Sequence, residues 1–146
     1  AKQGHWQALC SLAGLYSEGL GVRKDEKKAR QILKKASETG YAVAQRKLGE
    51  FLDLGKGGSR DLEAAASWFL QAAQQDDSEA QFRLAWAYIF GKGVAKNETQ
   101  GLGWMQEASS LGHAHAYGAL GEAFWKGRGV EKDAKQARYW FEKASS

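Results

Sequence analysis

The stretch Gly127-Arg128-Gly129-Val130-Glu131-Lys132-Asp133 decides the fold, because the same seven-residue pattern stands at three earlier places in the chain. The earlier copies begin at Gly19, Gly55 and Gly91, so consecutive copies are 36 residues apart. A sequence that repeats itself at a fixed period of about 20 to 50 residues is typical of a solenoid or another repeat array. The chain is therefore predicted to contain four copies of one structural unit.

Each copy of this pattern fits a loop that joins two helices. Its first Gly follows the last apolar residue of a helical pattern, where a helix commonly ends in a left-handed conformation that Gly adopts without strain. Its last residue can accept hydrogen bonds from the first turn of the next helix, and is Asp25, Asp61, Asn97 or Asp133. A Val in three copies is expected to anchor the loop. Gly58 replaces it in the second copy, which predicts the loosest loop.

Two helical stripes recur in register, one before and one after each loop. Their spacing of three and four residues is typical of the buried face of a helix. In the last copy they are Ala116, Leu120, Gly121 and Phe124, then Ala137, Trp140, Phe141 and Ala144. In the first copy the stripe before the loop includes Ala8, Leu12 and Tyr16. Each repeat is therefore predicted to be a helix pair, here called helix A and helix B. Because Gly destabilises the interior of a helix, Gly101 and Gly103 predict that the third helix B is the least stable of the four.

The composition limits the classes to which the chain can belong. With 43% hydrophobic residues and no Pro, the 146-residue chain is expected to fold and to be helical almost throughout. The single Cys10 excludes an internal disulfide. The sequence contains no apolar run of about 18 residues, so insertion into a membrane is not predicted. The chain shows no signal-peptide pattern. A soluble protein is expected, and the bacterial cytoplasm, the periplasm and the exterior of the cell are equally compatible locations.

The recurring unit A-x-x-x-L-[GA]-x-x-[YLF]-x-x-G-x-G-V-x-x-[DN]-x-x-x-A-x-x-W-F-x-x-A resembles the Sel1-like repeat, a relative of the tetratricopeptide repeat with a longer connecting loop. The resemblance covers four in-phase copies and implies an all-α, right-handed α-solenoid of four antiparallel helix pairs. A single domain over residues 1–146 is expected, with repeats at about 5–40, 41–76, 77–112 and 113–146. Each repeat is expected to stack on its neighbour, because one helix pair cannot bury both of its stripes.

The resemblance also implies a concave groove that is lined by helix A residues outside the buried stripe. In the third and fourth repeats this rule selects large apolar side chains where solubility alone would favour polar ones. The predicted partner-binding residues are Trp86, Trp125, Ile89, Phe82, Phe90, Glu50, Asp53, Glu79, Glu122 and His115. Trp86, Trp125 and Ile89 are the expected apolar anchors. For Phe82 and Phe90, packing between neighbouring A helices is an equal alternative.

The function that the resemblance implies is a non-catalytic adaptor that binds a segment of a partner protein in this groove. Bacterial signalling, secretion, host contact and toxin neutralisation are roles of this kind. The charges expected in the groove over all four repeats are predominantly acidic, which favours an apolar or basic partner segment. No nucleophile, base and orienting group can be assembled from the sequence, so neither an enzyme nor a cofactor is expected. His113 and His115 lack further ligands at metal spacing, so no metal site is predicted.

Two other classes of function stay open at this point. A spacer segment of a longer solenoid would only hold other domains apart, and its Trp140 and Phe141 side would pair with further repeats or with another copy. RNA binding would use the basic cluster Arg23, Lys24, Lys27, Lys28, Arg30, Lys34 and Lys35. This cluster lacks interleaved aromatic side chains, so nucleic acid is not the expected partner.

Overall fold

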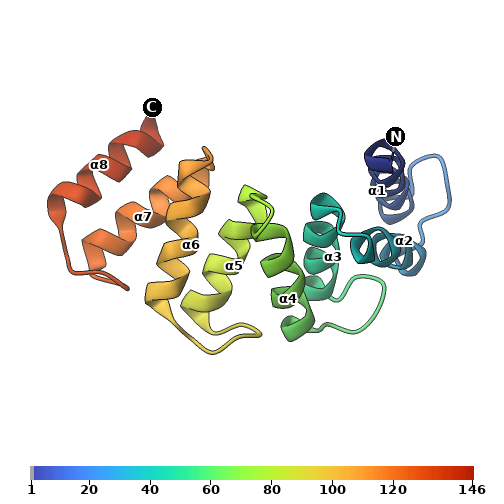
Figure 1. Ribbon diagram of the computed structural model, residues 1–146, viewed down its shortest axis with the longest axis horizontal. Helices are drawn as coiled ribbons and strands as arrows, with labels where there is room; N and C mark the ends of the chain where they lie inside the picture. The colour runs from blue at the N-terminus through green and yellow to red at the C-terminus, as the bar shows by residue number, and fades with distance from the viewer. Residues whose placement is uncertain (1) are drawn as a thin grey trace. The chain divides into compact units, whose positions relative to one another are not determined.

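The computed structural model describes residues 2–146, and within this range the protein consists of eight α-helices and no strand (Figure 1). In chain order the helices are α1 (Lys2–Glu18), α2 (Glu26–Glu38), α3 (Ala42–Leu54), α4 (Leu62–Ala73), α5 (Ser78–Phe90), α6 (Glu98–Ser110), α7 (Ala114–Lys126) and α8 (Ala134–Ser145). The odd-numbered helices are the predicted helices A, and the even-numbered helices are the predicted helices B. The prediction of an all-α chain of four helix pairs is confirmed.

The chain forms two compact units, each of which holds two consecutive repeats. Unit 1 is Ala1–Gln75 with α1 to α4, and unit 2 is Asp76–Ser146 with α5 to α8. Inside each unit, the two helices of a repeat pack against each other. The helix A of the second repeat also packs against the helix B of the first, which gives the junctions α2–α3 and α6–α7.

The repeated loop ends one helix and begins the next, as the sequence predicts. Gly55, Gly91 and Gly127 end α3, α5 and α7 in the left-handed conformation, each with a φ of 70°. At the other end of the loop the predicted caps accept from main-chain amides of the following helix at 3.0 to 3.1 Å, and these caps are Asp25, Asp61, Asn97 and Asp133. Both ends of each helix connection are thus fixed by local hydrogen bonds.

The second Gly of the loop has a role that the sequence did not reveal. Gly129 has a φ of +76°, and a Cβ atom at this position would lie 2.8 Å from the carbonyl oxygen of Glu98, the first residue of α6. Gly57 makes the same approach to the carbonyl oxygen of Glu26 at the start of α2. In these two loops, the absent side chain therefore lets the loop touch the main chain of the preceding repeat.

The second loop has an anchor, although it lacks the Val. The Arg30 guanidinium donates to the carbonyl oxygens of Lys56 at 3.3 Å and Ser59 at 3.0 Å. A Cβ atom at Gly58 would lie 2.5 Å from Arg30 Nη1, so the guanidinium occupies the space that a side chain would need. Arg30 thus anchors this loop in place of the Val, and that it is the loosest of the four loops stays a prediction.

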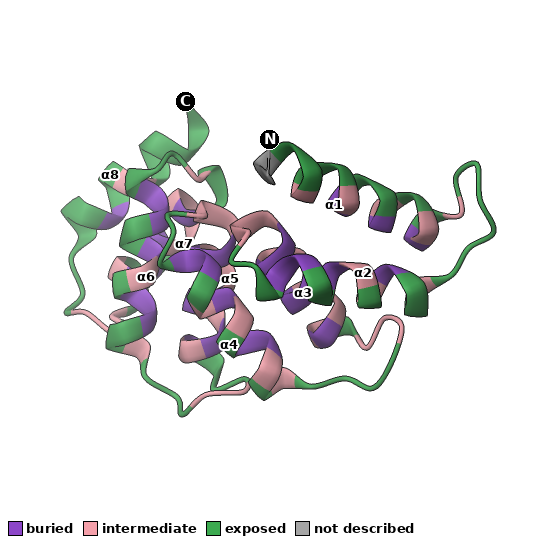
Figure 2. Cartoon of the chain, turned by 45° about the vertical axis from the view of Figure 1, so that its right-hand side comes forward, coloured by how far each residue is buried: buried purple, intermediate pink, exposed green. Residues whose placement is uncertain are grey.

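Small residues on the A helices receive large residues from the B helices. A Cβ atom at Gly49 would lie 2.6 Å from the Phe69 ring, and one at Gly121 would lie 2.7 Å from the Phe141 ring. In the second and fourth repeats, the close-packed interior therefore depends on pairing a missing side chain with an aromatic ring. Figure 2 shows that buried residues alternate with intermediate and exposed ones along the helices.

The recurring Leu is buried in the second, third and fourth repeats and exposed in the first. Leu120 on α7 is 0% exposed and Leu48 on α3 is buried, whereas Leu12 on α1 is 37% exposed. The prediction that Ala8 and Leu12 belong to a buried stripe is wrong, because both side chains are exposed, whereas Ala13 of the same stripe is buried. The residues that α1 buries are Cys10, Ala13 and Ser17.

Candidate partner-binding site

Helix α5 carries an aromatic row formed by Phe82, Trp86 and Phe90. These residues are four apart, so they share one face of the helix. The Trp86 ring is stacked on Phe90 with centroids 5.3 Å apart, and it meets Phe82 edge to face at 6.0 Å. Phe82 and Trp86 are half-buried against the core of unit 2, whereas Phe90 is 56% exposed. The row therefore presents stacked aromatic surface to solvent.

Residues at the start of α7 fix the Phe82 end of the row. His113 is stacked on Phe82 with ring centroids 4.5 Å apart, and its Nε2 lies 2.6 Å from Glu79 Oε2. The His115 ring lies 6.1 Å from Phe82 and 5.8 Å from His113. The structure brings Glu79, Phe82 and His115, which the sequence analysis selected, close to His113. The sequence analysis did not select His113, which stands at the capping position just before α7. Its place in the repeat could have revealed it. The equivalent position 36 residues earlier is Asp77, which caps the start of α5.

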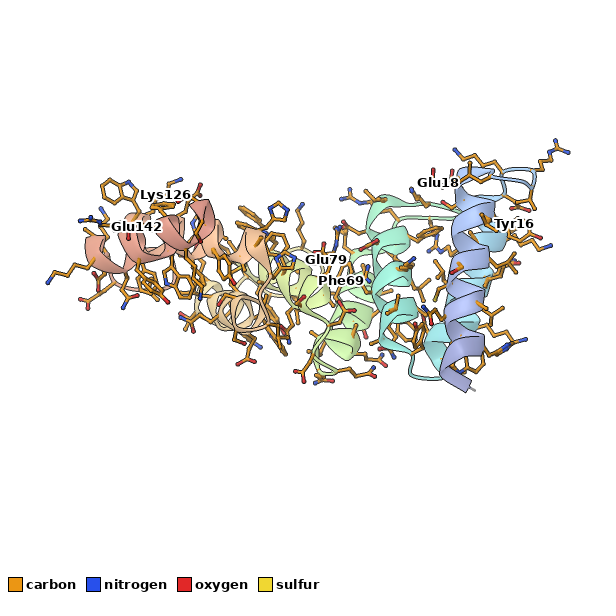
Figure 3. All side chains as sticks on the ribbon, turned by 90° about the horizontal axis from the view of Figure 1, so that it is seen from above. Tyr16, Glu18, Phe69, Glu79, Lys126 and Glu142 are labelled. Atoms are coloured by element: carbon orange, nitrogen blue, oxygen red, sulfur yellow. The ribbon has the colours of Figure 1, made fainter. Side chains whose placement is uncertain are left out.

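The charged residues of this face are largely paired. Glu79 Oε1 accepts from Arg83 Nε at 3.0 Å in addition to its contact with His113. Glu122 lies 3.9 Å from Lys126, and both side chains are well exposed. Glu79 on α5 and Lys126 at the end of α7 are labelled in Figure 3. Arg83 and Lys126 thus offset the two acidic residues, so this face of unit 2 is not acidic.

A small cavity lies between α5, α6 and α7, beside Trp86. Its volume is about 20 Å³, and its lining consists of Trp86, Ile89, Leu102, Met105, Ala119, Glu122, Ala123, Lys126 and Arg128. This volume suffices for about one water molecule, far less than the several hundred Å³ of a typical small-molecule site. This cavity is therefore too small to hold a metabolite.

Ile89 is a core residue and not a surface anchor. It is 6% exposed and packs in the hydrophobic core of unit 2. Gly101 on α6 explains this position, because a Cβ atom there would lie 2.8 Å from Ile89 Cγ1 and 2.7 Å from the carbonyl oxygen of Ala85. The missing side chain of Gly101 leaves space that Ile89 fills, so the prediction of Ile89 as an apolar anchor is wrong.

Trp86 and Trp125 do not line one pocket. Trp125 is 62% exposed and lines a separate groove of about 360 Å³ beside α8. We call it the end groove, and its lining residues are Trp125, Ala134, Ala137, Arg138, Phe141 and Glu142. Trp86 lines the small cavity beside α6 instead. The two predicted anchors therefore belong to different surfaces of unit 2.

The remaining predicted residues, Glu50 and Asp53, lie on α3 in unit 1. Glu50 forms an ion pair with Arg46 at 3.5 Å, and both side chains are half-buried. The main-chain oxygen of Asp53 accepts from Arg60 Nε at 2.7 Å. Glu50 is thus engaged within its own helix, while Asp53 takes part in holding the second loop.

A second aromatic cluster surrounds Lys143 on α8. Its Nζ lies 4.9 Å from the ring centroid of Tyr117, 5.5 Å from that of Trp140 and 5.9 Å from that of Tyr139. Tyr117 and Trp140 are stacked with centroids 6.1 Å apart. The cluster joins α7 to α8 through cation–π contacts, and the sequence reasoning did not find it.

Three observations bear on the chemistry of the described residues. No group of three His, Cys, Asp or Glu side chains within residues 2–146 is placed to hold a metal ion. In the same range, none of the helices has the length and apolarity that a membrane crossing requires. Cys10 is buried, and this burial raises the pKa of its thiol, which disfavours the reactive thiolate.

Comparison with known proteins identifies the repeat. The Sel1 repeat family matches the chain over residues 6–41, 42–77, 78–113 and 114–146. Among solved structures, a Sel1 repeat protein from Oxalobacter formigenes is 32% identical, with a TM-score of 0.91 over 96% of this chain and 57% of that chain. Cysteine rich protein B from Helicobacter pylori is 30% identical, with a TM-score of 0.66 over 80% of this chain and 90% of that chain.

A third structure is the protective antigen c5321 of uropathogenic Escherichia coli strains, which displays an SLR fold. It is 30% identical, with a TM-score of 0.94 over 99% of this chain and 31% of that chain. The chain thus spans 57% of the Oxalobacter protein and 31% of the antigen. Curated protein sequences give no match. The similarity to these structures confirms the predicted α-solenoid fold.

Proposed function

Because the chain belongs to the Sel1 repeat family, whose members generally mediate protein–protein interaction, we propose that it is a non-catalytic adaptor that binds a segment of a partner protein. Within this family the repeats typically form a scaffold without catalytic activity. The aromatic row of α5 is the observation that carries the proposal, because Phe90 exposes more than half of its surface above a stacked Trp86. Exposed aromatic surface of this kind is typical of interaction sites.

The site that we propose consists of the aromatic row, His115 and Glu122. The His113 contacts hold the Phe82 end of the row in place before any partner arrives, which lowers the entropy lost on binding. Arg83 and Lys126 offset Glu79 and Glu122, so electrostatic attraction gives a basic segment little advantage here. An apolar partner segment with an aromatic or long aliphatic side chain suits this surface better.

The wider role depends on the partner protein. The likeness to a protective antigen of uropathogenic bacteria supports host contact among the adaptor roles considered, and we include that role in the proposal. In this proposal, the acidic residues Glu50 and Asp53 of α3 are contacts that unit 1 makes to the partner protein.

The test compares single variants at Trp86 and Phe90 of the aromatic row with a variant at Trp125. Peptides would be selected from a random display library on the whole chain, and their dissociation constants would be measured by calorimetry. We expect Trp86→Ala and Phe90→Ala each to weaken binding by about tenfold or more, because hot-spot aromatic residues contribute about 2 kcal/mol. Trp125→Ala is the matched control, since Trp125 lines the end groove, and it should leave the affinity unchanged.

Two results would contradict the proposed site. One is equal affinity of the wild type and the Trp86→Ala variant while circular dichroism shows an unchanged helical fold. The other is loss of binding in the Trp125→Ala variant alone, which would move the site to the end groove.

A further inference from the structure

The net charge of the chain comes from one short segment of unit 1, the first repeated loop and helix α2. Residues 19–38 contain seven basic and three acidic side chains, a net charge of +4, which equals the net charge of the whole chain. The remaining residues carry 14 basic and 14 acidic side chains. Between Glu26 and Glu38, α2 has five basic residues and no acidic one. Positive charge that is concentrated in this way favours an anionic partner.

Four of these basic residues share one exposed face of α2, which we call the lysine face. All four are exposed, and they are Lys27, Lys28, Lys34 and Lys35. Residues seven apart lie on the same side of a helix, so Lys27 aligns with Lys34 and Lys28 with Lys35. The buried residues of α2 lie on the opposite side and are Ala29, Leu33, Ala36 and Ser37. The lysine face therefore extends for about 12 Å along the outer side of the helix.

The other B helices show that the repeat does not need basic residues at these positions. In α4 and α6 the equivalent residues are not buried and none is basic, and they are Glu63, Ala64, Leu70, Gln71, Thr99, Gln100, Gln106 and Glu107. Helix α8 has Lys135 and Lys143 there, but Glu142 stands between them. The same side of the helix is thus at the surface in every repeat, and only α2 makes it uniformly basic.

The stability of α2 does not explain the lysines of its first turn. Lys27 and Lys28 follow the N-cap residue Asp25 and Glu26. The dipole of a helix disfavours positive charge at this end and favours it at the other, where Lys34 and Lys35 lie. Lys27 and Lys28 therefore stand where a helix prefers acidic residues, which indicates a function other than stability.

The ammonium groups of the lysine face are accessible to a partner. Within residues 2–146, no ion pair is formed by Lys27, Lys34 or Lys35. The Lys28 Nζ lies over the ring of Tyr16 on α1, 4.7 Å from the ring centroid (Figure 3). This cation–π contact orients Lys28 and leaves its charge uncompensated by an acidic group.

We propose that the lysine face binds a short acidic segment of a partner protein, with about four Asp or Glu carboxylates that match its four ammonium groups. Acidic side chains stand at both ends of the face, Asp25 and Glu26 before it and Glu38 after it. A short acidic segment fits between these ends. A long nucleic acid or an anionic membrane surface would also meet the flanking carboxylates, which repel it.

The composition of the face supports the same choice of partner. Every exposed residue of α2 is polar, so the face offers no aromatic ring for stacking on a base and no apolar side chain for insertion into a membrane. The face lies in unit 1 and shares no residue with the aromatic row of α5, so this proposal does not rest on the proposed function. Its binding should weaken as the salt concentration rises, because the attraction is between exposed charges.

The experiment follows the main-chain amides of the whole chain by nuclear magnetic resonance at low salt, where charges are least screened. The probe is a soluble peptide with a run of about four Glu residues between Gly-Ser flanks, and a peptide with Gln in place of Glu is its control. We expect the Glu peptide to shift the amides of residues 27–35, with a dissociation constant that rises with salt. The Gln peptide should leave these amides unchanged.

Two double variants locate the binding. Lys27→Gln/Lys34→Gln should weaken binding of the Glu peptide by about fivefold or more, because it removes two ion pairs with the peptide. It should fold, since Gln106 occupies the position of Lys34 in α6, and circular dichroism checks this. Lys92→Gln/Lys135→Gln is the matched control, because it removes the same charge from exposed positions of unit 2. It should change the dissociation constant by less than about twofold.

Three results would overturn the proposal. The first is the absence of shifts in residues 27–35 at about 1 mM of the Glu peptide, the scale of weak association. The second is equal weakening by both double variants, which would mean that only the net charge matters. The third is tighter binding of a short DNA duplex or of vesicles that contain phosphatidylglycerol, lost in the Lys27→Gln/Lys34→Gln variant, which would assign the face to a nucleic acid or to a membrane.

Discussion

At the scale of single residues, the glycines of this chain differ in what surrounds them. Gly101 has a main-chain oxygen and the Ile89 side chain within 3 Å of the place where a Cβ would lie. Gly103, two residues later in the same helix, has nothing within 4 Å. The sequence treats the two alike as weak points of α6, and only their surroundings separate them.

Alanine substitution should therefore have opposite effects at these two positions. Gly101→Ala should lower the free energy of unfolding by about 1 to 3 kcal/mol, because the main chain of α5 has to move to make room. Gly103→Ala should raise it by about 0.5 to 1 kcal/mol, because Ala restricts the unfolded chain and favours the helix. Urea unfolding followed by circular dichroism measures both, and equal shifts in the same direction would contradict the packing described for Gly101.

The same scale shows why part of the candidate site was predictable. Phe82, Trp86 and Phe90 follow from helical spacing, because residues four apart share a face whatever the partner helix is. Ile89 was misplaced, because its burial depends on a missing side chain at Gly101 on another helix. His113 was missed because its contact with Glu79 joins residues that lie 34 positions apart in the sequence.

At the scale of the helix, the position of a residue in the array decides its burial. Leu12 and Leu120 occupy the same place in the repeat, yet the first is exposed and the second is fully buried. A periodic sequence assigns the same role to every copy, so the exposed side of α1 could not be read from the pattern. The loops were predictable, because their caps and left-handed glycines act within a few residues.

Truncation of the recurring Leu should reveal this difference. Leu120→Ala should cost about 2 to 5 kcal/mol of the free energy of unfolding, through lost burial and the cavity left behind. Leu12→Ala should cost less than about 1 kcal/mol at dilutions where the chain is monomeric, because its side chain is already exposed to water. Thermal or urea unfolding of the two variants provides the measurement, and similar losses at both positions would show that α1 is covered in solution.

At the scale of the whole molecule, the single domain expected over residues 1–146 stays a prediction. The structure has two compact units, and repeat arrays derive their cooperativity from the interfaces between neighbours. Hydrogen exchange distinguishes one cooperative domain from two, because it reports the opening of each segment separately.

Leu48→Ala tests this prediction, since Leu48 is buried within unit 1. If the chain is one cooperative domain, the loss of about 2 to 5 kcal/mol should speed exchange in the most protected amides of both units. Mass spectrometry of peptides from residues 1–75 and 76–146 would show the effect in each. Faster exchange confined to residues 1–75 would mean that the units unfold independently.

The approach of Gly57 and Gly129 to the preceding repeat has a consequence for how such a chain changes its length over evolution. The contact is made to a main-chain oxygen, so it does not depend on which side chain the neighbouring position carries. Duplication or deletion of a whole 36-residue segment preserves it, whereas a shift of one residue places a side chain where none fits. Genetic recombination can therefore lengthen or shorten the protein in whole repeats, while the surface residues of each copy are free to diverge.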